Sequence, residues 1–169
     1  MQVELLYQAL AAGGESVRHL LAAVSPEEAR FKVKPDGWSI LEVLCHLYDE
    51  EREDFRYRLD VMLHRPAEKW PPNDPPGWVT ARRYNEQNFA EKLEAFLDER
   101  RKSVAWLAGL QAPNWDAVYP APWGPMKAGD MLASWVTHDN LTLRHFVELR
   151  YAWVCRAVQP YQVAYAGEW

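Results

Sequence analysis

The sequence predicts an all-α protein, a four-helix bundle in a single domain that covers residues 1–169. Four long segments carry apolar residues at helical spacing, and stretches rich in proline and tryptophan separate them. The composition is 49% hydrophobic and 25% charged, which is typical of a globular chain of this length with one buried core.

The first helix is expected within residues 2–24, where leucines and valines recur every three or four positions. Gly13 and Gly14 interrupt this pattern and predict a bend, because glycine weakens a helix interior. A connector is expected to begin at Ser25 and to run to Trp38.

The second helix begins with a capping box, in which the Ser39 hydroxyl and the Glu42 carboxylate each accept a free backbone N–H. It is expected to run to about Leu63. Its buried stripe comprises Ile40, Leu44, Leu47, Phe55, Leu59 and Met62. Acidic residues occupy its other faces: Glu42, Asp49, Glu50, Glu51 and Glu53.

Residues 65–78 contain five prolines, which predicts a loop without a helix. Thr80 is the expected cap of the third helix, which runs to about Leu110. Residues 111–127 form a second stretch rich in proline and tryptophan, with room for a short hairpin.

The fourth helix is expected over residues 128–156. The tail, residues 157–169, is aromatic and more apolar than a disordered terminus, so we expect it to pack back on the bundle.

Composition also excludes some classes of function. The net charge is −5 and basic residues are scattered, which argues against a nucleic-acid partner. No apolar run approaches the roughly 20 residues that span a membrane. The N-terminus does not resemble a secretory signal, so a cytoplasmic location is expected. Cys45 and Cys155 are too few for a disulfide framework and are expected in the core.

Polar residues interrupt the apolar face of the fourth helix. His138, Thr142 and His145 lie at helical spacing among Met131, Trp135 and Leu149. Buried polar groups need partners, because an unpaired one costs about 1–3 kcal/mol. A metal ion is one such partner, and hydrogen bonds to water or a neighbouring helix are the alternative.

His46 is the matching feature on the second helix. Glu50 follows it by one turn, and an imidazole and a carboxylate at this spacing can share a divalent metal. An exposed His–Glu pair on an acidic helix face is the alternative.

Together these segments resemble one family. Residues 38–47 (WSILEVLCHL) resemble the W-S-x-x-E-x-L-x-H-L opening of the second helix in DinB-like proteins, also called YfiT-like metalloenzymes. Residues 137–145 (THDNLTLRH) resemble the H-D-x-x-H-x-R-Q stretch on their last helix. Residues 161–169 (YQVAYAGEW) are similar to the Y-x-x-x-Y-x-G-x-W ending of some members.

The resemblance implies a four-helix bundle, often a homodimer, with nickel or zinc held by one histidine of the second helix and two residues on the last. His46 and His138 match two of these positions, whereas Thr142 replaces the third histidine. His145 lies roughly 10 Å along the axis from His138, too far to share its ion. Glu50 is therefore the expected substitute, and Thr142 is expected to ligate weakly or to hold a water.

The resemblance also implies an activity, in which the metal activates a low-molecular-weight thiol such as bacillithiol or mycothiol to attack a small-molecule substrate. Four residues are then candidate substrate contacts: Trp135, Asp139, Arg144 and His145. A metal-free bundle that binds a small ligand, or acts in stress response, is the competing hypothesis. Its pocket would be lined by tryptophans: Trp38, Trp78, Trp123 and Trp135.

Overall fold

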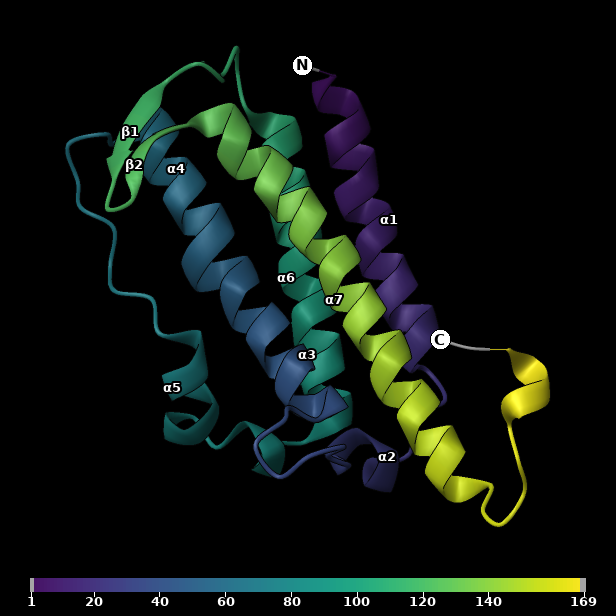
Figure 1. Ribbon diagram of the computed structural model, residues 1–169. Coiled ribbons are helices and arrows are strands. Elements are labelled where there is room, and N and C mark those ends of the chain that lie inside the picture. Colours follow the sequence, from purple (N-terminus) through teal and green to yellow (C-terminus); the bar gives the residue numbers. More distant parts are fainter. Residues whose placement is uncertain (1, 168–169) are drawn as a thin grey trace.

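The computed structural model describes residues 2–167 and shows a bundle of four long helices, as predicted (Figure 1). The second long helix is continuous but changes type along its length, from α3 through a π-helical stretch, η1, to α4. The long helices are α1 (Val3–Leu21), α3–η1–α4 (Ile40–Asp49, Glu50–Phe55 and Arg56–His64), α6 (Phe89–Gly109) and α7 (Ala128–Ala157).

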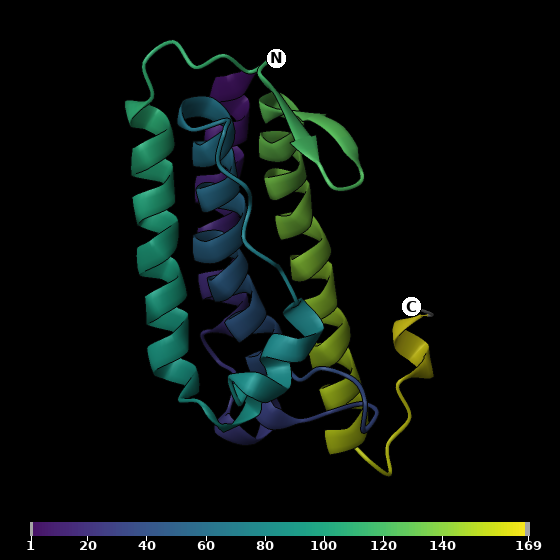
Figure 2. The same cartoon turned by 90° about the vertical axis from the view of Figure 1, so that its left-hand side faces the viewer.

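The first two long helices are not neighbours in space. α1 packs against α6 and α7, and the helix α3–η1–α4 packs against the same two helices from the other side. The first two long helices therefore lie on one diagonal of the bundle. α1 and α7 run in one direction, while α3–η1–α4 and α6 run in the other (Figures 1 and 2).

Two short helices lie in the connections. α2 (Pro26–Arg30) begins at Ser25, whose side chain accepts a hydrogen bond from the Glu28 amide. α5 (Pro75–Ala81) lies partly within the proline-rich stretch, where no helix was expected. That expectation was wrong because proline is well suited to the first turn of a helix, where its missing N–H costs nothing.

The predicted start of the third helix was also wrong. Thr80 lies inside α5, and the chain then forms a 3₁₀ turn, η2 (Tyr84–Glu86). α6 begins after Asn88, whose side chain accepts a hydrogen bond from the Glu91 amide at 3.2 Å. Asparagine and threonine are both good helix caps, so residue type alone did not distinguish the two positions.

The hairpin in the second irregular stretch is present. β1 (Val118–Ala121) pairs with β2 (Gly124–Lys127) in antiparallel register, with Val118 opposite Lys127. Gly124 turns the chain at φ 131°, a conformation that L side chains rarely adopt. This hairpin lies at one end of the bundle, beside the start of α7 (Figure 1).

The tail does not pack back on the bundle, so this prediction was wrong. Residues 158–167 stand away from the helices in both views and contain a 3₁₀ turn, η3 (Ala164–Ala166) (Figures 1 and 2). Tyr161 is 77% exposed, and Tyr165 is fully exposed. Trp169, the last residue of the predicted motif, lies outside the described residues.

Gly13 and Gly14 lie inside one uninterrupted helix, α1, and both are buried. They allow close approach. A Cβ at Gly13 would collide with the Asp139 carboxylate, and one at Gly14 would lie 2.9 Å from Cγ of Arg100. The two glycines therefore make room for a buried ion pair that joins α6 to α7.

The acidic residues of the second long helix are largely buried, whereas the sequence pattern placed them on its polar faces. Glu42 completes the predicted capping box and also pairs with Lys32 at 2.8 Å. Asp49 accepts hydrogen bonds from Tyr84 and from Arg82. Helical periodicity did not reveal this because the cations come from distant segments.

Two further expectations concern cysteines and membranes. Cys45 is buried in the core as predicted, whereas Cys155 is partly exposed. Within residues 2–167, none of the helices is long and apolar enough to cross a membrane.

Candidate functional site

The fold brings His46 of α3 and His138 of α7 together. Their ring centroids lie 5.5 Å apart, with the ring planes at 71°. The two helices are antiparallel neighbours, so residues about 90 positions apart in the chain meet inside the bundle. This is how sites are built in helix bundles, from side chains on facing helices.

Both imidazoles are held in their neutral form. Burial, together with the nearby His138 and His145, lowers the pKa of His46 to about 4. Burial and the Arg100 guanidinium lower the pKa of His138. A neutral imidazole has a free nitrogen lone pair, which is the form that binds a metal ion.

Aromatic side chains fix the two rings. Trp38 lies edge-on to His46 with centroids 5.1 Å apart, and Phe55 lies 5.2 Å from His138. Phe55 in turn stacks on Trp135 at 5.8 Å, with nearly parallel planes. The pair therefore has an apolar surround that limits its rotation and its hydration.

Glu50 lies beside His46 at the start of the π-helical stretch η1. Its Oε1 is 3.7 Å from Nδ1 of His46, and neither atom has a hydrogen-bond partner within residues 2–167. Burial, followed by the neighbouring Asp54 carboxylate, raises the pKa of Glu50. π-helical turns inside α-helices occur frequently at functional sites, which fits this location.

Thr142 and His145 lie one and two turns beyond His138. Thr142 is buried on the inner face of α7. His145 is partly buried, and its charge is close enough to contribute to the lowered pKa of His46. The structure therefore brings His138 and His145 near the second long helix and buries Thr142 between them along α7.

The donors present fit a metal ion only in part. His46 and His138 each have a buried, unpartnered Nδ1 atom, as expected of groups awaiting a ligand. In the described part of the chain, however, no three His, Cys, Asp or Glu side chains are arranged to hold one ion together. Glu50 is therefore not in place as the expected third ligand, although it contacts the edge of His46.

Asp139, a predicted substrate contact, is buried and its carboxylate is already paired. Its carboxylate pairs with Arg100, and Glu51 pairs with the other side of the same guanidinium at 2.8 Å. Trp135 is fully buried and donates from Nε1 to Glu51 at 3.0 Å, so its indole N–H is already paired as well. Glu51 and Arg100 were missed, since neither lies in a motif.

Arg144 also lies outside the site. Its side chain is exposed and pairs with Glu148 one turn later, with Nε 3.2 Å from Oε1. Exposed pairs of this kind are ordinary features of helix surfaces. The predicted role of Arg144 in binding a substrate carboxylate is therefore not supported by its placement.

The site is open to solvent at His138. A groove of about 540 Å³ runs between Phe55 and the outer face of α7, where Ser134, Thr137 and Leu141 complete its walls around His138. A small molecule can therefore approach His138 along α7.

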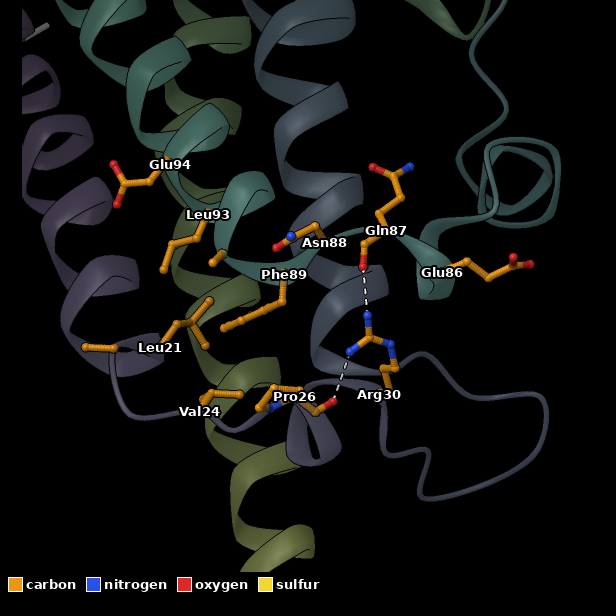
Figure 3. Close-up of a pocket in the computed structure, with 12 residues that line it drawn as sticks. Leu21, Val24, Pro26, Arg30, Glu86, Gln87, Asn88, Phe89, Leu93 and Glu94 are labelled. Carbon is orange, nitrogen blue, oxygen red and sulfur yellow. Dashed lines mark hydrogen bonds between the residues drawn. The ribbon is translucent and has the colours of Figure 1, made fainter.

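A separate cavity of about 590 Å³ lies between α1, α2 and the start of α6, and it includes none of the predicted site residues (Figure 3). Its cation, Arg30, donates to the backbone oxygens of Pro26 and Gln87. Its two carboxylates pair with arginines elsewhere: Glu86 with Arg83 and Glu94 with Arg18. We therefore place the candidate site at the histidine pair.

Comparisons with known proteins agree with this architecture. The family model described as the DinB superfamily matches residues 9–145. The chain belongs to the DinB superfamily. Among solved structures it is similar to YfiT from Bacillus subtilis, with a TM-score of 0.77 and 17% identity over 88% of this chain and 85% of that one. YfiT is described as "a probable metal-dependent hydrolase with an unusual four-helix bundle topology".

That likeness shows a shared fold. In this DinB-superfamily chain, the first two long helices lie on one diagonal of the bundle. A comparison with curated protein sequences found no match.

Proposed function

We propose that this DinB-superfamily chain is a divalent-metal-dependent enzyme that acts on a small molecule, with His46 and His138 as metal ligands. The observation that carries the proposal is the pair of facing, neutral imidazoles 5.5 Å apart at the end of an open groove. Histidine is the commonest metal ligand, and a catalytic ion needs open positions for water or substrate.

Glu50 and Thr142 would support these two metal ligands. Glu50 would orient His46 through Nδ1, as carboxylates often do behind a metal-bound histidine. Thr142, buried next to His138 on α7, would contribute its hydroxyl as a weak ligand or hold a water. Nickel or zinc is the proposed ion, and when bound it would polarise a substrate carbonyl or favour the ionised form of a water or thiol.

The chemistry proposed is transfer of an acyl or similar group to water or to a thiol. The description of YfiT as a metal-dependent hydrolase supports water as the acceptor. The family resemblance supports the finer alternative, a low-molecular-weight thiol such as bacillithiol or mycothiol. Because a thiolate is the reactive form of a thiol, either acceptor would benefit from the same cationic centre.

The second candidate is a metal-free bundle that binds a small ligand. It is favoured by Thr142 in place of the usual histidine and by the absence, within residues 2–167, of a third His, Cys, Asp or Glu arranged with the pair. In that case His46 and His138 would serve only to line a ligand pocket.

Two finer expectations also belong to this proposal. We propose a homodimer, because α7 leaves Leu141, Val147 and Val154 exposed on its surface. We also propose that the protein is located in the cytoplasm, as expected in the sequence analysis.

Metal analysis of the protein, purified without a histidine tag and dialysed after incubation with nickel or zinc, tests the main proposal. We expect close to one ion per chain. A ratio near zero with both metals would reject the metalloenzyme and favour the ligand-binding bundle. If metal is bound, dependence of turnover on added thiol distinguishes a transferase from a hydrolase.

A further inference from the structure

A third hollow lies against the long helix that carries His46, but neither histidine lines it. Its volume is about 570 Å³, and it lies between the start of α4, the proline-rich loop and the turn of the hairpin. Asp54 and Arg58 line it from the long helix, Trp70 and Asn73 from the loop, and Trp123 from the hairpin.

The cavity has a buried cation with hydrogen-bonding capacity to spare. Arg58 is only 7% exposed, and its Nε lies 2.5 Å from Oδ1 of Asp54, in a geometry that leaves Nε without a hydrogen bond. No hydrogen bond joins this guanidinium to another residue between positions 2 and 167. A guanidinium has five N–H donors, so this one can still bind an acceptor.

Aromatic rings form the walls. Trp70 stacks on Tyr119 with centroids 4.2 Å apart, and the Arg58 guanidinium lies 4.8 Å from the centre of the Trp70 ring. Trp123 lies 5.9 Å from Trp70 and is 67% exposed at the hairpin turn. A large apolar ring so placed offers a flat surface on which a second ring can stack.

The loop and the hairpin are tied together, so the cavity is formed before any ligand arrives. The Tyr119 hydroxyl accepts from the Trp70 amide at 3.0 Å and donates to the Glu68 carbonyl at 2.9 Å. Asn73 donates to Asp54 at 3.1 Å and anchors the other end of the loop to the long helix. Binding to a preformed cavity avoids the cost of ordering it.

The cavity lies beside the same long helix that carries His46. Asp54 on its wall follows Glu50 by four residues and raises the pKa of that carboxyl, and Glu50 lies beside Nδ1 of His46. A molecule held in the cavity would therefore lie against the same helix as part of the proposed reaction centre.

We propose that this cavity binds a neutral aryl-acyl compound, an aromatic amide or ester, with its ring on Trp123 and its carbonyl oxygen facing Arg58. A neutral acceptor suits the cavity better than an anion, because Asp54 already balances the charge of Arg58. The role of this compound as substrate rests on the proposed function, whereas its binding does not.

The test uses the full chain without metal and phenylacetamide as the probe, with binding measured by saturation-transfer difference NMR. We expect Trp123→Ala to weaken binding about tenfold, in line with the energy of an aromatic pair. Tyr161→Ala removes a ring of similar exposure from the remote tail and should leave binding unchanged.

Phenethylamine is the comparison probe, because it keeps the ring but has no oxygen that could accept a hydrogen bond from Arg58. We expect it to bind more weakly than phenylacetamide. Tighter binding of the amine, equal effects of the Trp123 and Tyr161 variants, or no binding of phenylacetamide would each overturn the proposal. A chain that binds phenylacetamide but no metal would contradict the proposed function and leave the cavity assignment intact.

Discussion

Oε1 of Glu50 lies 3.7 Å from Nδ1 of His46, and neither atom has a hydrogen-bond partner within residues 2–167. The separation is slightly too long for a hydrogen bond, so a small movement of either side chain would close it. Such a contact would fix the ring of His46 through Nδ1 and leave its other nitrogen, Nε2, as the atom that can bind an ion. The two histidines and Glu50 should therefore differ in their effects on metal affinity.

Metal titration of single variants is expected to show this order. Glu50→Gln should weaken nickel or zinc binding roughly 10- to 100-fold, which is typical for a residue that orients a ligand. His46→Ala and His138→Ala should weaken it further, because each removes a ligand. His64→Ala is the matched control, since that exposed histidine pairs with Asp60. Equal losses in all four variants would contradict this assignment.

The stability of the metal-free protein should depend on pH through His46. Its folded pKa of about 4 lies below the ordinary value of 6.5, so the unfolded chain binds more protons between these values. The free energy of unfolding should therefore decrease as pH falls from 6.5 to 4. His46→Gln should reduce this decrease by about 1–3 kcal/mol, because one pKa unit corresponds to about 1.4 kcal/mol.

Urea unfolding at pH 4 and pH 7 measures this difference, and His64→Gln serves as the exposed control. Comparison of variants is needed because Glu50 has a raised pKa and acts in the opposite direction. A pH dependence that is the same in wild type and His46→Gln would refute the prediction.

Asp139 should matter for stability rather than for substrate binding. Asp139→Ala leaves the buried Arg100 with only Glu51, and removal of one partner from a buried ion pair costs about 3–5 kcal/mol. Asp98→Ala removes an exposed carboxylate that pairs with Arg101 and Lys102, and should cost less than about 1 kcal/mol. Similar losses of unfolding free energy in the two variants would show that the buried ion pair does not stabilise the protein more than the exposed one.

Gly13→Ala tests the close approach of α1 to the same ion pair. The added methyl would collide with Asp139, so we expect a loss of about 1–3 kcal/mol, as in other overpacked cores. Gly109→Ala, at the end of α6, meets no atom within 4 Å and should be neutral or slightly stabilising. Thermal unfolding of both variants measures the contrast, and a stable Gly13→Ala protein would argue against this packing.

The sequence predicted the long helices well because their signals are local. The capping box at Ser39 and Glu42 marked the start of the second long helix, and it is present. Apolar spacing was sufficient to place α7 to within a residue. Thr80 was wrongly assigned as the cap of the third long helix. A cap signal does not show whether the residue lies inside another short helix, here α5, a few residues before the true start.

The site could be predicted only in part. The positions of His46 and His138 followed from their matching motifs on two helices, and the structure brings the rings together. The environment of Asp139 did not follow, because its partner Arg100 comes from α6 and has no motif of its own. Long-range ion pairs depend on how helices are arranged, which local periodicity does not encode.

The diagonal placement of the first two long helices has a consequence for synthesis. When α3 leaves the ribosome, its neighbours α6 and α7 have not yet been made, and α1 cannot cover it. At about 5–20 residues per second, the roughly 90 residues between His46 and His138 take several seconds to emerge. During that interval His46 has been made but His138 has not. The nascent chain therefore cannot hold an ion between the two histidines before the last helix is made.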